Sequence, residues 1–265
     1  MFLIGTIFVI VFALMVHLRN SANQHSATRT VTPYEIQRRI RIHFEPQPLI
    51  YPSHWYKPPI SARAVPLKKE MYQRTLTIIE HALSKYPDDF DMQLEEVYVL
   101  ERLEFYGIAF GASYVAPSER NRLLLTNNSY PDEMFVRLFH AEYSSVLLKL
   151  YPQFFNEGAW LAKLPHGLSY SEPETSDVAL LQLGEALEQK SPELLVRGFL
   201  SHYATTNIEN DFNSVVKHLF VPDSTFKLSD LRHYPLVQAK ADLAIRFYSQ
   251  VHPGFSAAYF EQFSL

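Results

Sequence analysis

The 265-residue chain contains no cysteine and only 8 glycines. Without thiols it can form neither disulfide bonds nor cysteine-ligated zinc sites, and thiol catalysis is excluded. This absence does not identify a compartment, because periplasmic and cytosolic proteins alike can lack cysteine. The sequence has no glycine-rich phosphate-binding loop. No long basic run accompanies the net charge of −4, so nothing in the chain is typical of nucleic-acid binding.

Apolar and aromatic residues are plentiful instead. Hydrophobic residues make up 47% of the chain, aromatic residues 14% and charged residues 20%, which is typical of a globular protein. The length suits one domain of about 200 residues with an additional segment. We therefore predict three parts: a membrane anchor or signal segment over residues 1–19, a linker and proline-rich arm over 20–65, and a folded domain over 66–265.

The first 19 residues are the candidate membrane segment. Phe2 to Val16 is almost entirely apolar. As a helix, residues 1–18 would extend about 27 Å, which is just enough for a short membrane span. The segment also suits a signal peptide, but no lysine or arginine precedes it and no clean cleavage site follows. We therefore favour an uncleaved, single-pass transmembrane helix over a cleaved signal.

The rest of the chain is predicted to be mainly α with a small mixed β-sheet, an α+β fold. Prolines such as Pro46, Pro52 and Pro58 exclude a long helix from the arm. Alternation predicts a short strand over 38–44, and an apolar run predicts a buried strand over 123–125. Residues 90–105 read as a helix that passes into a strand, and 106–111 as turn or strand. We predict helices over 71–86, 132–151, 173–189, 191–202, 209–220 and 233–249.

The predicted helix 132–151 carries Glu142 between Ala141 and Ser145. A zincin metal helix has the motif H-E-x-x-H, in which two histidines bind zinc and the glutamate activates the metal-bound water. The glutamate is present here, but Ala141 and Ser145 occupy the two histidine positions. One glutamate in a helix is a weak motif, and an ordinary amphipathic helix is the plain alternative.

A second block strengthens this interpretation. Residues 198–212 read GFLSHYATTNIENDF, which resembles a stretch of the bacterial zinc-binding metallopeptidases similar to G-F-V-x-x-Y-A-x-x-N-x-x-E-D-F-A-E. In that family it follows a helix with H-E-F-S-S or H-E-F-x-H. Upstream, Tyr106-Gly107 with Gly111 and Tyr114, followed by residues 122–125, resemble the family's strand pair. The matching blocks span about residues 100 to 220 in the family's order, and the resemblance implies a zincin-like fold.

The departures from the family pattern fall on the metal ligands. The histidine before the helix glutamate is replaced by Ala141, and Ser145 takes the place of the second histidine. The two glutamates of E-D-F-A-E fall on Asn210 and Ser214, so that only Glu142 and Asp211 retain the family's residue types. Because a zinc site needs three protein ligands, we expect no bound metal, with zinc as the alternative.

Helix geometry excludes a simple replacement for the lost histidine. At about 100° per residue, His140 and Glu142 lie on opposite faces of their helix, so we expect His140 in the core. Glu209, one residue before the lost glutamate, is a weaker candidate ligand. We therefore take Glu142 as a remnant general base, and Ala141, Ser145, Asn210 and Asp211 as the residues that line a groove.

These residues leave three functions open. The first is a degenerate metallopeptidase domain without zinc or peptidase activity, whose groove binds a peptide or protein, for example by strand addition near residues 123–125. The second is an active zinc peptidase with unconventional ligands among Glu142, Glu209 and Asp211. The third is a structural envelope protein. The resemblance implies a periplasmic or extracellular domain, whereas the arginines after residue 18 favour the cytoplasm, so the orientation stays open.

Overall fold

The computed structural model describes residues 34–35, 39–128, 131–170, 191–222 and 233–264. Over this part of the chain the fold is α+β, with one mixed sheet of seven strands and seven α-helices. The strands are β1 (Tyr34–Glu35), β2 (Arg41–His43), β3 (Arg63–Pro66), β4 (Glu96–Phe105), β5 (Ile108–Phe110), β6 (Ala112–Val115) and β7 (Arg122–Thr126). The helices are α1 (Tyr72–Leu83), α2 (Asp132–Leu150), α3 (Glu157–Leu161), α5 (Pro192–Val196), α6 (Ile208–Phe220), α7 (Pro235–Val251) and α8 (Ala257–Glu261).

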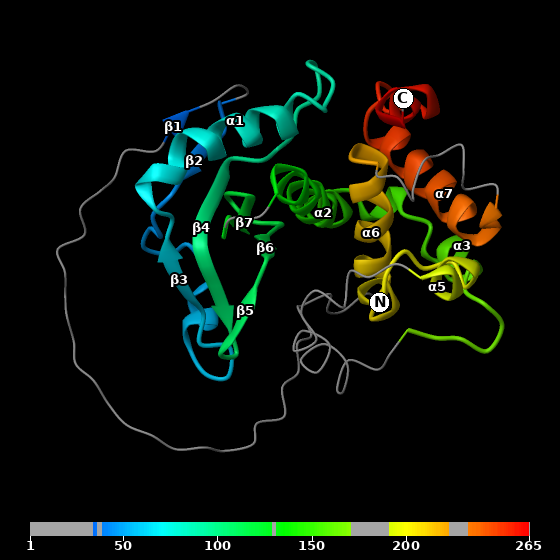
Figure 1. Ribbon diagram of the computed structural model, residues 1–265, viewed down its shortest axis with the longest axis horizontal. Coiled ribbons are helices and arrows are strands. Elements are labelled where there is room, and N and C mark those ends of the chain that lie inside the picture. The colour runs from blue at the N-terminus through cyan, green and yellow to red at the C-terminus, as the bar shows by residue number, and fades with distance from the viewer. Residues whose placement is uncertain (1–33, 36–38, 129–130, 171–190, 223–232, 265) are drawn as a thin grey trace.

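The long strand β4 is the centre of the sheet. It runs parallel to β2 on one side and to β7 on the other, and its second half pairs antiparallel with β3 and β5. Strand β6 pairs antiparallel with β7 and ends the path β1-β2-β4-β7-β6. Helix α2 packs against β6 and β7 on one side and against α6 on the other, so it lies between the sheet and the C-terminal helices (Figure 1).

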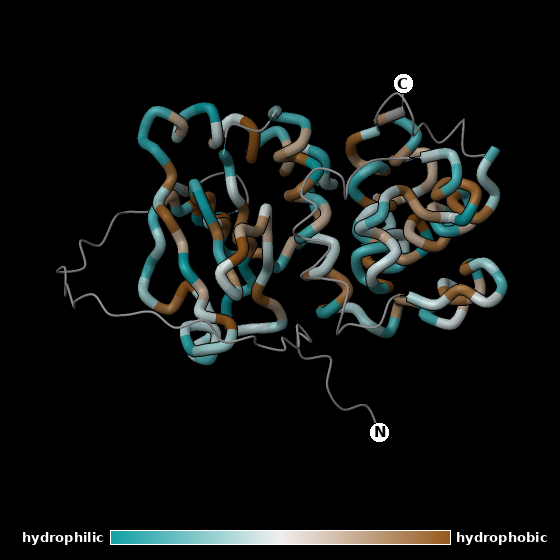
Figure 2. The backbone as a smooth tube through the Cα atoms, turned by 60° about the horizontal axis from the view of Figure 1, so that its bottom comes forward, coloured by the Kyte–Doolittle hydropathy of each residue, from teal (hydrophilic) through white to brown (hydrophobic). Residues whose placement is uncertain are grey.

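The two faces of the sheet are buried by different parts of the chain. Val97 and Val99 point to the core that α1 and α2 share with the C-terminal helices, whereas Tyr98 and Leu100 point to a smaller core on the other face. The proline-rich arm supplies Trp55 and its neighbours to that second core. Figure 2 shows hydrophobic segments inside both the sheet half and the helical half of the molecule. Alternation along a strand produces this division, since successive side chains point to opposite faces.

Local signals place α2 and α6 where the sequence predicts helices. Asp132 and Glu133 lie in the first turn of α2 and Lys149 in its last, an arrangement that the helix dipole favours. Helix α6 begins after Asn207, whose side chain caps the backbone N–H of Asn210. These two helices carry the residues that the sequence singles out.

Several expectations require correction. The sheet is larger than the small one we predicted, and the arm is part of the fold because it provides β2, β3 and core residues, so the folded unit begins before residue 66. Residues 91–95 are not helical, and β4 begins at Glu96. A strand buried on both faces reads as a continuous apolar run, which periodicity cannot distinguish from a buried helix.

Two further differences concern single elements. The helix predicted over 191–202 is only α5, because Gly198 adopts a left-handed conformation (φ +83°) shortly after its end. Strand β7, which we expected at a sheet edge, lies between β4 and β6. The predicted helix 173–189 and the candidate membrane segment lie outside the described residues. Within those residues, no helix is both long and apolar enough to span a bilayer.

Candidate functional site

The junction of α2 and α6 is held by neutral side chains. Ser144 Oγ donates to Asn213 Oδ1 at 2.5 Å, and Asn213 Nδ2 donates to Ser145 Oγ at 2.7 Å. All three residues are buried. The side chain of Asn213 therefore satisfies two helix-α2 hydroxyls at once. One of them is Ser145, the position at which a zincin helix carries its second histidine.

Glu209 lies one turn before Asn213 on the same face of α6, and it connects the helix to two other elements. Tyr114 of β6 donates its hydroxyl to Glu209 Oε1 at 2.8 Å. Lys149, near the end of α2, forms an ion pair with Glu209 Oε2 at 3.0 Å. The glutamate thus joins the edge strand, α2 and α6 around one carboxylate.

Glu142 borders this cluster without a bonded partner. No residue in the described part of the chain forms an ion pair or a hydrogen bond with its carboxyl group. Burial and, next, the negative charge of Glu209 raise the pKa of Glu142 to about 8, while the positive charge of Lys217 acts in the opposite direction. A glutamate that is largely protonated near neutral pH is typical of acid–base and binding sites.

Tyr114 shares this environment. Its pKa is raised by burial and then by the nearby charge of Glu209, so the phenol stays neutral and donates its proton. Glu142 contributes to the same shift. The edge strand β6 and helices α2 and α6 therefore meet at a partly enclosed acidic cluster.

Asp211 does not belong to this cluster. At about 100° per residue it lies roughly 200° from Glu209 around α6, on the face that meets α7. Its Oδ2 accepts hydrogen bonds from Trp160 Nε1 at 3.0 Å and Tyr170 Oη at 2.7 Å, and Lys240 Nζ lies 2.7 Å away. Asp211 and Lys240 are both fully buried. We expected Asp211 to line a groove with Glu142, and the structure places it in a buried ion pair instead.

The other predicted site residues are placed as follows. Asn210 lies in the first turn of α6, where its Nδ2 donates to Thr206 Oγ1 at 2.7 Å. Ala141 is partly exposed, and its carbonyl accepts the hydroxyl of Ser144. His140 is fully buried, where it stacks on Phe220 and shares a 2.8 Å hydrogen bond with Tyr86.

In the described part of the chain, the predicted positions do not bring a set of metal ligands together. Ala141 offers no ligand atom, the Ser145 hydroxyl is used by Asn213, and Asp211 faces away from Glu142 and Glu209. Within the described residues, no group of three or more histidine, aspartate and glutamate side chains could hold a metal ion. The unconventional ligand set of Glu142, Glu209 and Asp211 therefore does not converge.

Sequence reasoning missed three contributors to this region: Lys149, Asn213 and Lys240. Lys149 is two helical turns after Glu142, and Asn213 is four residues after Glu209, so helical spacing alone could have placed both at the junction. Lys240 could not have been found in this way, because its partner Asp211 lies 29 residues earlier in the chain, on another helix.

Comparison with known proteins yields one structure. No protein-family model matches the chain, and no curated protein matches its sequence. The crystal structure of a "putative zinc-binding metallo-peptidase" from Bacteroides caccae is similar over 76% of this chain and 80% of its own, with 10% sequence identity and a TM-score of 0.48. A similarity of this size does not indicate a function, so a functional proposal must rest on the residues of this chain.

Proposed function

We propose that this domain is a metallopeptidase-like module without a working metal site that binds extended peptides along strand β6. The observation that carries the proposal is the free edge of β6 beside the Glu142 cluster. Strand addition to an open edge is a common way for a domain to hold a peptide, since main-chain hydrogen bonds supply affinity and flanking pockets supply specificity.

The pairing of β6 with β7 defines the groups available at this edge. The N–H of Thr126 donates to the carbonyl of Gly111, and the register pairs Ala112 with Leu125. Backbone groups alternate in direction along an antiparallel strand, so those of Ala112 and Tyr114 point away from β7. No described residue pairs with them.

The side chains beside the edge suit an added strand. Tyr114 packs toward α2 and reaches Glu209, so alternate side chains of a bound peptide would lie next to Glu142, Glu209 and Lys149. Both charge signs are available there. The edge itself differs from our expectation, since the free strand is β6 and not residues 123–125.

Loss of peptidase activity belongs to the same proposal. Ala141 and Ser145 stand at the positions of the two motif histidines, and Asn213 donates a hydrogen bond to the Ser145 hydroxyl. Glu142 keeps the place of a general base, but three ligands do not converge beside it to hold the water that such a base would activate. The absence of a ligand set favours binding over hydrolysis.

A peptide selected against the full chain from a random library tests the proposal. Methylation of single backbone nitrogens along that peptide should weaken binding at least tenfold at every second position and have little effect at the others. Ala112→Pro should weaken binding similarly because it removes an outward N–H, whereas Ala112→Gly keeps that group and serves as the control. Uniform tolerance of methylation, or equal binding by both variants, would exclude strand addition to β6.

Membrane attachment through residues 1–19 is a separate proposal supported by the apolar run from Phe2 to Val16. Fractionation of cells that express the full chain, or a chain starting at residue 20, tests it. We expect the full chain in the membrane pellet after alkaline carbonate extraction and the shortened chain in the supernatant. Equal distribution of the two would refute the anchor.

A further inference from the structure

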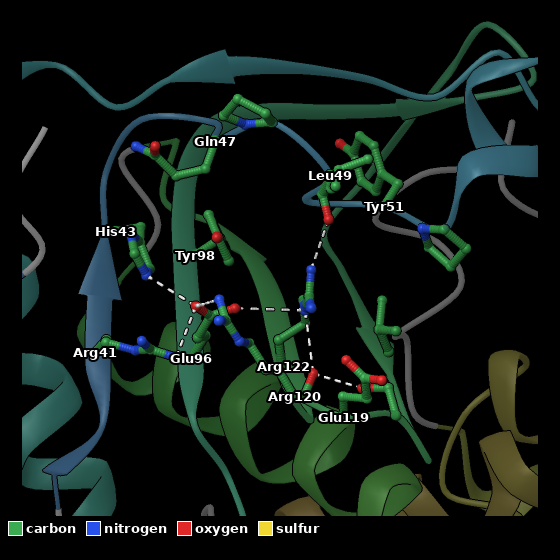
Figure 3. Close-up of a pocket in the computed structure, with 14 residues that line it drawn as sticks. Arg41, His43, Gln47, Leu49, Tyr51, Glu96, Tyr98, Glu119, Arg120 and Arg122 are labelled. Atoms are coloured by element: carbon green, nitrogen blue, oxygen red, sulfur yellow. Dashed lines mark hydrogen bonds and ion pairs between the residues drawn. The ribbon is translucent and has the colours of Figure 1, made fainter. Parts of the chain in front are cut away.

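A second polar site lies on the opposite face of the sheet, at the start of the parallel strands. It is a cavity of about 770 Å³ between the sheet and the proline-rich arm. Arg41 of β2, Glu96 of β4 and Arg122 of β7 occupy adjacent positions in the register, so their side chains meet at its floor (Figure 3). Glu142, Glu209 and the other residues of the α2–α6 junction do not line it.

Positive charge predominates around one buried carboxylate. Glu96 Oε1 lies 3.1 Å from Arg41 Nη2 and 3.7 Å from Arg120 Nη1, and its Oε2 lies 3.6 Å from Arg122 Nε. The lining residues include three arginines and two glutamates, Glu96 and Glu119, and Glu95 also pairs with Arg41 from outside the cavity. An exposed guanidinium at this site suits a ligand that carries a carboxylate.

The three arginines are committed to different degrees. Arg122 donates to the carbonyls of Leu49 and Ile50, and thereby fastens the arm over the sheet. Arg41 is shared between Glu95 and Glu96. Arg120 is 57% exposed, and among the described residues its guanidinium contacts a carboxylate only at 3.7 Å, in Glu96, so it is available for another carboxylate.

The floor of the cavity also contains a histidine that has no hydrogen-bond partner in the described part of the chain. His43 is 92% buried and stacks on Tyr98 with ring centroids 4.4 Å apart. Its Nε2 is 3.6 Å from Glu96 Oε1, longer than a hydrogen bond, and its Nδ1 has no partner among the described residues. Buried polar atoms that the protein leaves unsatisfied are uncommon, and they are a usual feature of sites that await a ligand or water.

An apolar residue is held at the rim. Leu49 adopts a left-handed conformation (φ +66°), which is strained for leucine, and its side chain is 70% exposed. The bond from Arg122 to its carbonyl keeps it there. Pro48, Pro52 and Val115 continue this apolar wall. The cavity therefore combines a cationic floor with a hydrophobic lip.

We propose that this cavity binds a small organic monocarboxylate with an apolar body, whose carboxylate is held by Arg120 and Arg41 and whose body packs against Leu49. Guanidinium groups bind carboxylates through paired, charge-assisted hydrogen bonds. This ligand site is independent of the peptide edge at β6.

Fluorine NMR titration of the full chain with 4-fluorophenylacetate tests the proposal, with 4-fluorophenylacetamide and acetate as matched probes. We expect the acid to bind at least tenfold more tightly than the amide, which lacks the charge, and than acetate, which lacks the apolar body. Arg120→Gln should remove the preference for the acid. The control Arg102→Gln changes an arginine of equal exposure in β4 that pairs with Glu104 away from the cavity, and should leave binding unchanged.

Two more variants separate binding from stability. Leu49→Asn removes the apolar side chain and should weaken binding about fivefold. Because asparagine tolerates the left-handed conformation, the thermal midpoint should not fall. His43→Phe preserves the stacking on Tyr98 and should weaken binding by a smaller factor. Equal affinity for acid and amide, equal affinity in wild type and Arg120→Gln, or no response to the acid up to its solubility limit would each overturn the proposal.

Discussion

Helix α6 has a buried ion pair on one face, and on its other face it meets Glu142 of α2. On the outer face, Asp211 is enclosed with Lys240 and receives two further hydrogen bonds on the same oxygen. On the inner face, neutral bonds from Asn213 tie α6 to α2, and the nearby Glu142 has no ion-pair partner among the described residues. Helix α6 thus lies between a carboxylate that is buried and paired and a carboxyl group of α2 that has no bonded partner among the described residues.

This contrast distinguishes structural from functional carboxylates. A buried ion pair is expensive to assemble and far more expensive to break, so the Asp211 pair acts as a fixed connection between α6 and α7. A carboxyl group with a raised pKa and no bonded partner among the described residues is a poor structural element and a good candidate for binding or proton exchange. Each prediction below probes one side of the comparison.

The largest effect is expected on the outer face. Lys240→Met removes the cation and leaves the Asp211 charge buried without a partner, so the free energy of unfolding should fall by about 3–5 kcal/mol. Denaturant titration measures it. The double variant Lys240→Met with Asp211→Asn removes both charges and should recover much of the loss. If the double variant is as unstable as the sum of its two single changes, the pair is not the origin of the loss.

A smaller loss is expected on the inner face. Asn213→Ala removes both hydrogen bonds to α2 and leaves Ser145 without its donor, which should cost about 1–3 kcal/mol of unfolding free energy. Asn210→Ala is the matched control, because its side chain bonds only to Thr206 within its own end of the helix. Equal losses in the two variants would show that Asn213 does not join the helices.

The raised pKa of Glu142 predicts that the stability of the fold falls as the pH rises. Its pKa rises from an ordinary value of 4.5 to about 8, so between those values the folded state retains a proton that the unfolded state has released. Stability from this group is therefore present below pH 4.5 and is lost as the pH rises through 8. Glu142→Gln mimics the protonated form and should gain about 1–2 kcal/mol at pH 9 after allowance for solvent screening.

Unfolding midpoints measured from pH 5 to pH 9 provide the check. The difference between Glu142→Gln and wild type should grow with pH across this range. Glu261→Gln, at an exposed position in α8, supplies the control and should parallel the wild type. A constant difference between Glu142→Gln and wild type would place the pKa of Glu142 outside the range.

The smallest effect concerns metal binding to a redesigned site. Ala141→His with Ser145→His recreates H-E-x-x-H on α2, although the second change overfills a buried position at a cost of about 1–3 kcal/mol. A third ligand should be most effective at position 213, because Asn213 already contacts Ser145. The triple variant that includes Asn213→Glu should therefore bind zinc about tenfold more tightly than the triple variant that includes Asn210→Glu, a difference of about 1.4 kcal/mol.

Isothermal titration with zinc ranks these variants. The comparison revises the expectation from sequence that position 210 supplies the missing ligand, since its side chain is turned to Thr206 within its own helix end. Equal zinc affinity for the two triple variants would show that both positions of α6 reach the redesigned site.

The sequence predicted the helices and strands of the site better than the contacts between them. Acidic residues in its first turn and a proline after its last turn predicted α2 closely. The apolar run at 123–125 predicted β7. Alternation and helical spacing are local properties, so they can be read from adjacent residues. The family alignment treated Asp211 as a groove residue, although its position relative to Glu209 already placed it on another face.

From the sequence alone follow the absence of thiol chemistry, the α+β class, the two helices of the junction and the absence of histidine at positions 141 and 145. Only the tertiary structure decided that β6 is the free edge, that Lys240 neutralises Asp211, and that three arginines from separated segments surround Glu96. The physical reason is that burial and charge pairing depend on contacts between distant segments. Local propensity and spacing carry no information about which distant residue fills the space beside a carboxylate.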